Sequence, residues 1–165
     1  MRRLPPGWRK AVLSVHVIAS VGWLGVHACL VALLAIGLAA DGPARAGAAY
    51  TAAGMLVQTL VAPVSLTSLG TGLVLSSATP WGLFRHYWVA AKLVLTILLV
   101  FGSNLSLGPA VVEMAAAAQG GTAVPPDSDR LRYVVALSVA LCALLAATLL
   151  STVKPFGRIR PPQRG

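Results

Sequence analysis

The sequence predicts an all-α protein. We expect a single membrane domain over residues 1–165, folded as a four-transmembrane-helix bundle with both termini in the cytoplasm (N-in/C-in). The chain has 165 residues, of which 57% are hydrophobic and 10% charged, and its mean hydropathy is +0.81. The hydrophobic residues form long stretches, and about 20 such residues are enough to cross the hydrocarbon core of a bilayer. A soluble domain carries more charge than this, so none is expected.

The net charge of the chain is +9, which on a soluble protein would suggest nucleic-acid binding. Here the basic residues stand at the ends of hydrophobic stretches, as they do in membrane proteins, so nucleic acid is not expected as a partner. The expected partner is the lipid bilayer, together with a second copy of the chain or another membrane protein.

The first helix is expected over residues 11–38. Four basic residues precede it, as in a secretory signal peptide, but the hydrophobic region of a signal is only about 7–15 residues long. The hydrophobic stretch here runs from Ala11 to Ala39, so we interpret it as a retained membrane helix. Asp41, Gly42 and Pro43 are expected to end it.

The second helix is expected over residues 50–77, with Pro63 near its middle. Proline removes one backbone hydrogen bond, so Pro63 predicts a kink and a free carbonyl at Thr59. The third helix is expected over 86–107, where Pro109 ends or bends it, and residues 111–119 are a candidate helical extension.

The fourth helix is expected over residues 131–153, after a polar loop at 120–129. Alanines spaced along one face predict tight helix packing on the fourth helix and on the first. These alanines are Ala136, Ala140, Ala143 and Ala147, and Ala28, Ala32, Ala35 and Ala39.

The orientation follows from the distribution of the 13 Lys and Arg residues. Nine lie in the two terminal tails and the second loop, and three lie on the opposite side with all four acidic residues. Since cytoplasmic loops are rich in Lys and Arg, both termini are expected in the cytoplasm.

Lys92 is the one basic residue inside a predicted span. It lies about 9 Å deep, at about 1.5 Å per residue. Its amine is expected either to reach back to the lipid headgroups or to face the bundle interior toward an anionic ligand. Thr96 and Ser103 continue its helix face.

The first helix carries a polar stripe formed by His16, Ser20, Trp23 and His27. These residues are spaced by 4, 3 and 4 positions. They therefore share an arc of about 60°, which is expected to face the bundle interior. His16 enters the membrane from the same side as Lys92 and to a similar depth, so the two predict a site in the cytoplasmic half.

An imidazole at such a site suits an axial haem ligand, a metal ligand or a proton relay. His16 and His27 are about 16 Å apart at about 1.5 Å per residue, too far to share one metal ion. One porphyrin near His16 fits these spacings, with His86 or Lys92 close by. His27 is interpreted as a packing residue and His86 as an interfacial one.

Other chemistry has weaker signals. The polar residues of the second helix, near the predicted kink, suggest a cavity, and Met55, His27 and Cys142 include copper-type ligands. Cys29 and Cys142 lie in hydrophobic stretches with no paired spacing and are interpreted as small apolar residues. No phosphate-binding loop, nucleophile elbow or H-E-x-x-H motif is present, so it stays open whether the chain is an enzyme.

Two segments resemble a known family. His16-Val-Ile-Ala-Ser-Val-Gly-Trp-Leu-Gly25 and Trp88-Val-Ala-Ala-Lys92-Leu-Val-Leu95 are similar to segments of HemJ-type protoporphyrinogen oxidase. The resemblance implies haem or porphyrin binding with His16 and Lys92 essential. In the loop 79–88 and the tail 154–158, the chain also resembles a group of small bacterial four-helix integral membrane proteins with no assigned activity. That resemblance implies a multi-pass protein of the bacterial plasma membrane, and common ancestry without shared catalysis.

Three functions are therefore carried forward. The first is a haem- or porphyrin-binding membrane protein, with His16, Ser20, Trp23, Lys92 and His86 as the binding residues and His16 as the axial ligand. The second is a non-enzymatic subunit or partner of a larger membrane complex. The third is a transporter of a small solute or a metal, which is disfavoured because the sequence shows no visible internal repeat.

Overall fold

The computed structural model describes residues 5–78, 87–119 and 126–153, and within these residues every regular element is a helix. Four helical spans are long and apolar enough to cross a membrane: Pro6–Leu38, Pro43–Ser77, Val89–Gln119 and Asp127–Ser151. The expected all-α, multi-pass membrane fold is confirmed at this level.

Two of the four spans are single helices, α1 (Pro6–Leu38) and α6 (Asp127–Val153). The other two each contain a short π-helical turn. The second span consists of α2 (Pro43–Leu56), the π turn η1 (Val57–Val61) and α3 (Ala62–Ala78). The third span consists of α4 (Tyr87–Gly102), the π turn η2 (Ser103–Leu107) and α5 (Gly108–Gln119).

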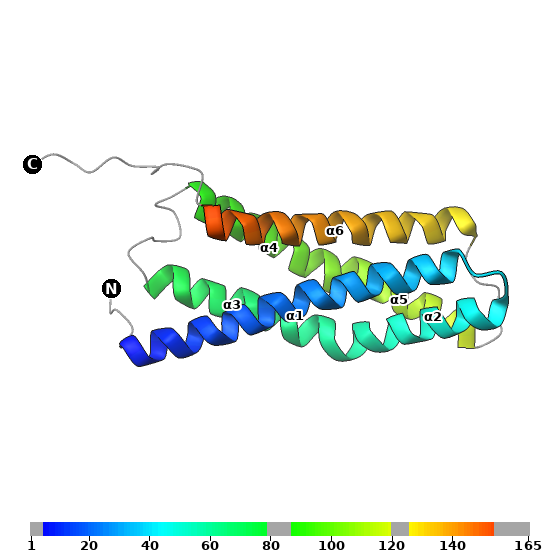
Figure 1. Cartoon of the computed structure of the whole chain (residues 1–165), viewed down its shortest axis with the longest axis horizontal. Coiled ribbons are helices and arrows are strands. Elements are labelled where there is room, and N and C mark those ends of the chain that lie inside the picture. Colours follow the sequence, from blue (N-terminus) through cyan, green and yellow to red (C-terminus); the bar gives the residue numbers. More distant parts are fainter. Residues whose placement is uncertain (1–4, 79–86, 120–125, 154–165) are drawn as a thin grey trace, which may run out of the picture.

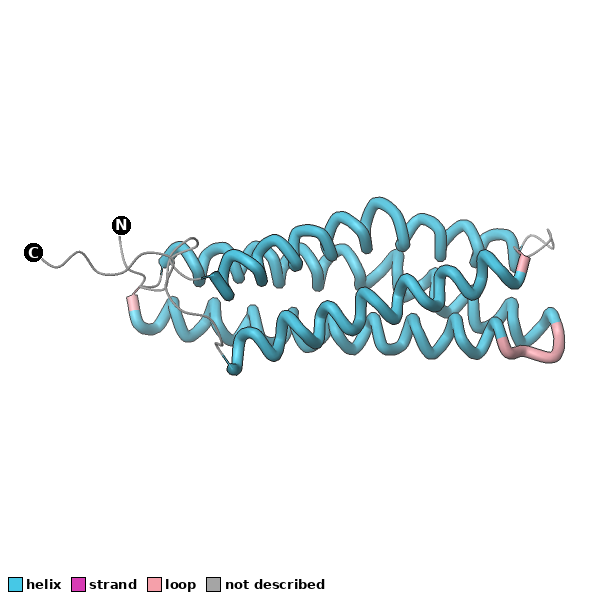
Figure 2. The backbone as a smooth tube through the Cα atoms, turned by 90° about the horizontal axis from the view of Figure 1, so that it is seen from above, coloured by secondary structure: helices cyan, strands magenta, loops and turns pink. Residues whose placement is uncertain are grey.

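The spans run side by side along the long axis of the molecule, as two views at right angles show (Figure 1 and Figure 2). The start of α1, the end of α3, the start of α4 and the end of α6 lie together at one end, which we call the terminal end. We call the other end, where α1 is connected to α2, the distal end. In the distal half α1 and α2 pack closely, as do α2 and α5, whereas in the terminal half α1 packs on α3 and α4 on α6, with less contact between α3 and α4.

The helices extend beyond their expected boundaries. Pro6 and Pro43 both occupy the first turn of a helix, where the fixed φ of proline fits and its missing N–H is not needed. Asp41–Pro43 therefore ends one helix and starts the next, seven residues before the expected start at Tyr50. The fourth helix starts at Asp127, because Asp127 and Asp129 stabilise its first turn.

Both prolines within the spans follow a π turn. η1 ends two residues before Pro63, and η2 ends two residues before Pro109. A proline ring collides with the carbonyl four residues earlier in a regular α-helix, and the wider π turn relieves that collision. The third span therefore continues through Pro109 to Gln119 instead of ending at Leu107.

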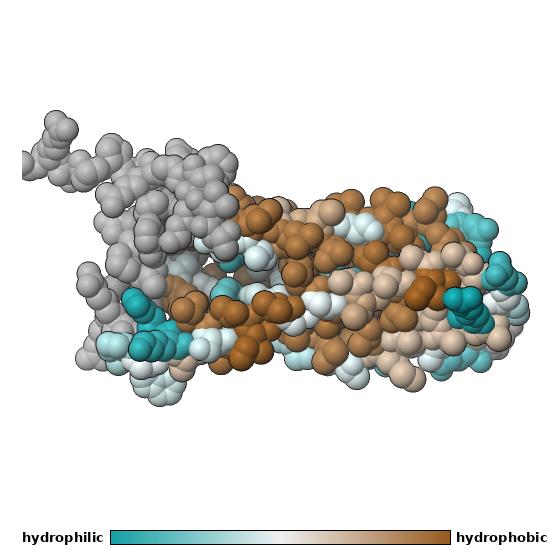
Figure 3. Space-filling model, viewed as in Figure 1, coloured by the Kyte–Doolittle hydropathy of each residue, from teal (hydrophilic) through white to brown (hydrophobic). Residues whose placement is uncertain are grey.

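The bundle is apolar on its outside as well as in its core. Large hydrophobic side chains such as Ile18, Leu98 and Val139 are more than half exposed. In Figure 3 apolar residues cover the middle of the visible face and polar residues gather toward its two ends, as expected for a protein surrounded by lipid.

Only one of the two predicted alanine ridges packs inside the bundle. Ala140 and Ala147 of α6 are buried, whereas Ala28 and Ala32 of α1, and Ala39 just after its end, are exposed. The ridge of α1 lies outside the bundle because the interior face of that helix is the polar stripe.

Gly54 of α2 allows close approach to α5. A Cβ at position 54 would lie 2.5 Å from the Cβ of Ala115. We expect Gly54→Ala to destabilise the bundle by about 1–3 kcal/mol, because two packed backbones must move apart. Unfolding of the detergent-solubilised protein by SDS measures this. Gly25→Ala is the control, since nothing lies within 4 Å of the added Cβ, and equal stabilities of the two variants would contradict the prediction.

Candidate functional site

The polar stripe of α1 faces the interior of the bundle. Trp23 and His27 are each 1% exposed, and His16 and Ser20 are half-buried. Polar groups in a membrane helix are stable only where partners exist, so this face packs against the other spans. The helical periodicity of the sequence therefore predicted the correct face.

His16 is held by α3. Its Nδ1 lies 3.0 Å from the backbone carbonyl oxygen of Ser68 and 3.0 Å from Oγ1 of Thr71. A carbonyl oxygen only accepts hydrogen bonds, so Nδ1 carries the proton and Nε2 keeps its lone pair. Within the described residues Nε2 has no hydrogen-bond partner.

Gly72 makes room for the His16 ring. A Cβ at position 72 would lie 3.2 Å from Cε1 of His16, which is tighter than ordinary van der Waals contact. One turn further along α1, the Oγ atoms of Ser20 and Ser68 are 2.8 Å apart. These polar contacts join α1 to α3 in the terminal half and fix the plane of the imidazole.

Lys92 faces α6. Its Nζ donates a hydrogen bond of 2.5 Å to Oγ of Ser151, which itself donates to the carbonyl of Ala147 at 3.1 Å. The side chain is half-buried. Of the two expectations for Lys92, the structure therefore supports the interior one.

The charge of Lys92 has no acidic partner in the described residues. All four acidic residues of the chain lie toward the distal end, in the α1–α2 connection, in α5 and in the first turn of α6. An ammonium has three donors, and the serine hydroxyl accepts only one of them. An uncompensated cation in a membrane span favours an anionic ligand.

An open groove of about 560 Å³ lies between α4 and α6. It is apolar, and it is lined by Ala90, Ala91, Val94, Leu95, Leu98 and Leu150. Lys92 and Ser151 do not line the groove, although each is the next residue in the chain after a lining residue.

His16 and Lys92 belong to different helix pairs, α1 with α3 and α4 with α6, respectively. Both residues lie in the terminal half of the bundle, since each is in the first half of a helix that starts at the terminal end.

A second polar cluster lies deeper in the bundle. Nε2 of His27 is 3.2 Å from Oγ of Ser103, and Nδ2 of Asn104 donates to Oγ of Ser65 at 3.0 Å. The ring of Trp23 packs edge-on against that of His27, with centroids 5.9 Å apart. Trp23 thus lies between the two histidines, in contact with the deeper one.

The weaker metal-site ideas find no support in the described residues. Met55 and Cys142 are exposed whereas His27 is buried, so these copper-type ligands are not gathered. No group of three or more His, Cys, Asp or Glu that could hold a metal ion occurs in the described part of the chain. His86, predicted beside His16, lies outside the described residues.

Sequence reasoning missed Ser151, Gly72 and Asn104. Asn104 is an amide within an otherwise apolar stretch, which is a usable signal. Nothing in the sequence marks Ser151 or Gly72, because their roles depend on which helices are neighbours.

Comparisons with protein-family models, with curated proteins and with solved structures found no match. The resemblance to HemJ-type protoporphyrinogen oxidase therefore stays a prediction.

The His16 contact can be tested through Gly72. We expect Gly72→Ala to push the ring from the Ser68 carbonyl and to lose about 0.5–1.5 kcal/mol of hydrogen bonding. ¹⁵N NMR of the histidine-labelled protein in nanodiscs should then show a smaller share of the Nδ1-protonated tautomer. Gly70→Ala is the matched control on α3, with nothing within 4 Å of the added Cβ. Identical histidine spectra for both variants would show that the ring does not depend on this space.

Proposed function

We propose that this is an integral membrane protein whose terminal half binds haem or another porphyrin through His16 and Lys92. One observation carries the proposal: the Ser68 carbonyl holds the Nδ1–H of His16 and leaves Nε2 with a free lone pair. Histidines that bind metals commonly donate their other N–H to a carbonyl in this way, which fixes the tautomer and orients the ring.

The residues present fit such a ligand. A porphyrin combines a large apolar ring with carboxylate side chains. The groove between α4 and α6 is apolar and, at about 560 Å³, lies within the usual range for ligand sites of about 300–1,000 Å³. Lys92 would pair with a carboxylate, and Nε2 of His16 would be the axial ligand if the porphyrin contains iron. Haem would supply electron-transfer chemistry to the site.

Ser20 and Trp23 support the site indirectly. Ser20 bonds Ser68, whose carbonyl orients His16, and Trp23 fills the interior below it. We further propose that the terminal end is cytoplasmic, because nine of the 13 Lys and Arg residues belong to the segments at that end. In a bacterium this membrane would be the plasma membrane.

Titration with haem and with metal-free protoporphyrin separates the two roles. The purified protein in detergent is expected to give a Soret band with haem and to retain the free porphyrin. His16→Ala should weaken haem binding strongly and free porphyrin binding little, because only haem has an iron to coordinate. Lys92→Gln should weaken both by about tenfold or more, since it removes a charge-assisted hydrogen bond.

Lys10→Gln is the control for Lys92, because Lys10 is an exposed lysine at the same end of the bundle. It should leave both affinities unchanged. A wild-type protein that binds neither compound would overturn the proposal, and purification with a stable protein partner would then favour the membrane-subunit alternative.

A further inference from the structure

The buried histidine and serine side chains of the described residues are gathered in one place. They are His27, Ser65, Ser68 and Ser103, with exposures of 1%, 0%, 5% and 3%. All four lie where α1 meets α3 and η2. Burying polar groups in a membrane protein is costly, so their clustering calls for an explanation beyond packing.

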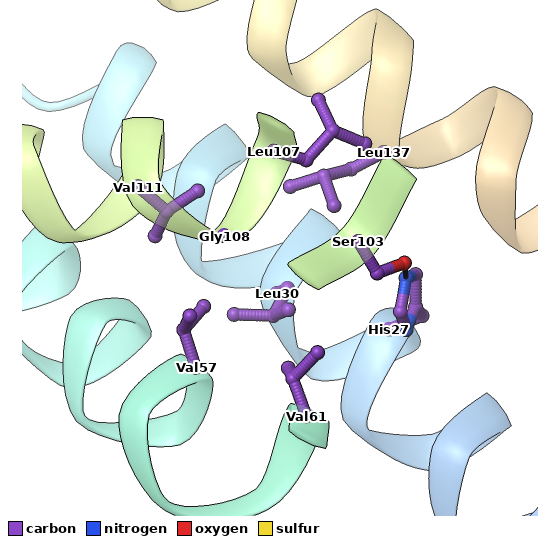
Figure 4. A pocket seen from close by; sticks show the side chains of 9 residues that line it. All are labelled: His27, Leu30, Val57, Val61, Ser103, Leu107, Gly108, Val111 and Leu137. Atoms are coloured by element: carbon purple, nitrogen blue, oxygen red, sulfur yellow. Dashed lines mark hydrogen bonds between the residues drawn. The ribbon is translucent and has the colours of Figure 1, made fainter. Parts of the chain in front are cut away.

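A small cavity lies beside His27 (Figure 4). Its volume is about 10 Å³, close to the minimum of about 10–15 Å³ for one water molecule. His27 and Ser103 form its polar wall, and apolar side chains from α1, both π turns, α5 and α6 form the rest. The cavity thus accepts a ligand no larger than water.

His27 needs another hydrogen-bond partner. Its Nε2 is bonded to Ser103, but its Nδ1 is buried and has no partner within the described residues. A buried polar group without a partner costs about 1–3 kcal/mol, and more where no other polar group is near. A bound water would satisfy it.

We propose that this cavity holds one water molecule hydrogen-bonded to His27, and that His27 exchanges protons with the terminal side of the membrane only. The proposal goes beyond porphyrin binding, uses a different histidine and does not depend on any ligand near His16.

The route toward the terminal side is lined by hydroxyl groups. His27 bonds Ser103, and the next residue in the chain, Asn104, donates to Ser65 at 3.0 Å. Water would bridge the steps from Ser103 to Ser65 and from Ser65 to Ser68. Ser68 lies one helical turn further along α3 and bonds Ser20 at 2.8 Å. Hydroxyl groups both donate and accept, so together with water they can pass a proton.

The route toward the distal side is closed. Leu30, Leu34, Val111, Met114 and Leu137 form a core there with exposures of 1–2%. Apart from His27 itself, no titratable side chain lines the cavity. A proton on His27 can therefore leave only toward the terminal side.

Water-to-histidine magnetisation transfer in solid-state NMR tests the bound water. The full chain is labelled with ¹⁵N-histidine and ¹³C-methyl leucine in phosphatidylcholine nanodiscs, and His27→Gln and Leu30→Ile identify the His27 and Leu30 signals. We expect fast transfer to the His27 ring. If transfer to His27 in the wild-type protein is as slow as transfer to the Leu30 methyl groups, that result by itself overturns the proposal.

Val61→Ile fills the cavity, because Val61 lines it and is 3% exposed. This variant should lose the transfer to His27, whereas Val74→Ile, at an exposed position of the same span, should keep it. Retained transfer in a folded Val61→Ile variant would show that the water is elsewhere. If that variant does not fold, the wild-type measurement still decides.

Two measurements test the route. Ser65→Ala should slow the exchange of the His27 ring proton with water several-fold, whereas Ser106→Ala, an exposed serine of η2, should not. Equal exchange rates in these two variants would exclude the route. Liposomes containing the wild-type protein should leak protons no faster than empty liposomes, and a faster leak would show that the distal side is open.

Discussion

The absence of water in the hydrocarbon core governs this structure. Each polar group within the bilayer needs a partner in the protein, because lipid offers none. The polar face of α1 therefore sets which side of that helix is inside, and its alanine ridge is left outside. His16, Ser20 and His27 each find a partner on another span, at 3.0, 2.8 and 3.2 Å. These contacts bind α1 to α3 and to η2.

The same constraint divides the bundle into unequal halves. The distal half is packed by apolar side chains, and Tyr50 there is buried with its hydroxyl accepting a hydrogen bond of 3.3 Å from Arg130. In the terminal half the helices pair as α1 with α3 and α4 with α6, and polar side chains lie between and beside these pairs. The larger apolar core is distal and a smaller one surrounds Trp23, whereas the terminal half also accommodates the polar contacts of His16 and the charge of Lys92.

Much of this was predictable from the sequence, for a physical reason. A helix repeats every 3.6 residues, so spacings of 4, 3 and 4 fixed the inner face of α1 without knowledge of its neighbours. Depth alone left Lys92 with two outcomes, and its partner Ser151 decides between them. The pairing of Asn104 with Ser65 was not predictable, because it depends on how two distant spans align. Likewise, Pro43 signalled the end of a helix while also being a favourable first residue for the next one.

The π turns explain the least predictable part of the fold. Residues facing the interior of a regular helix recur every three or four positions, as Leu99 and Ser103 do. The next buried residue after Ser103 is Gly108, five positions on, and its N–H bonds the Ser103 carbonyl as a π turn requires. A Cβ at position 108 would lie 2.5 Å from that carbonyl oxygen, so only glycine fits there. The extra residue in the π turn η2 rotates the helix that follows, so that a different set of positions in the third span faces the bundle interior. It turns Ser103 toward His27 and Val111 toward the distal core, and the small cavity lies where the two π turns face each other. Proline, glycine and the buried histidine are thus parts of one arrangement.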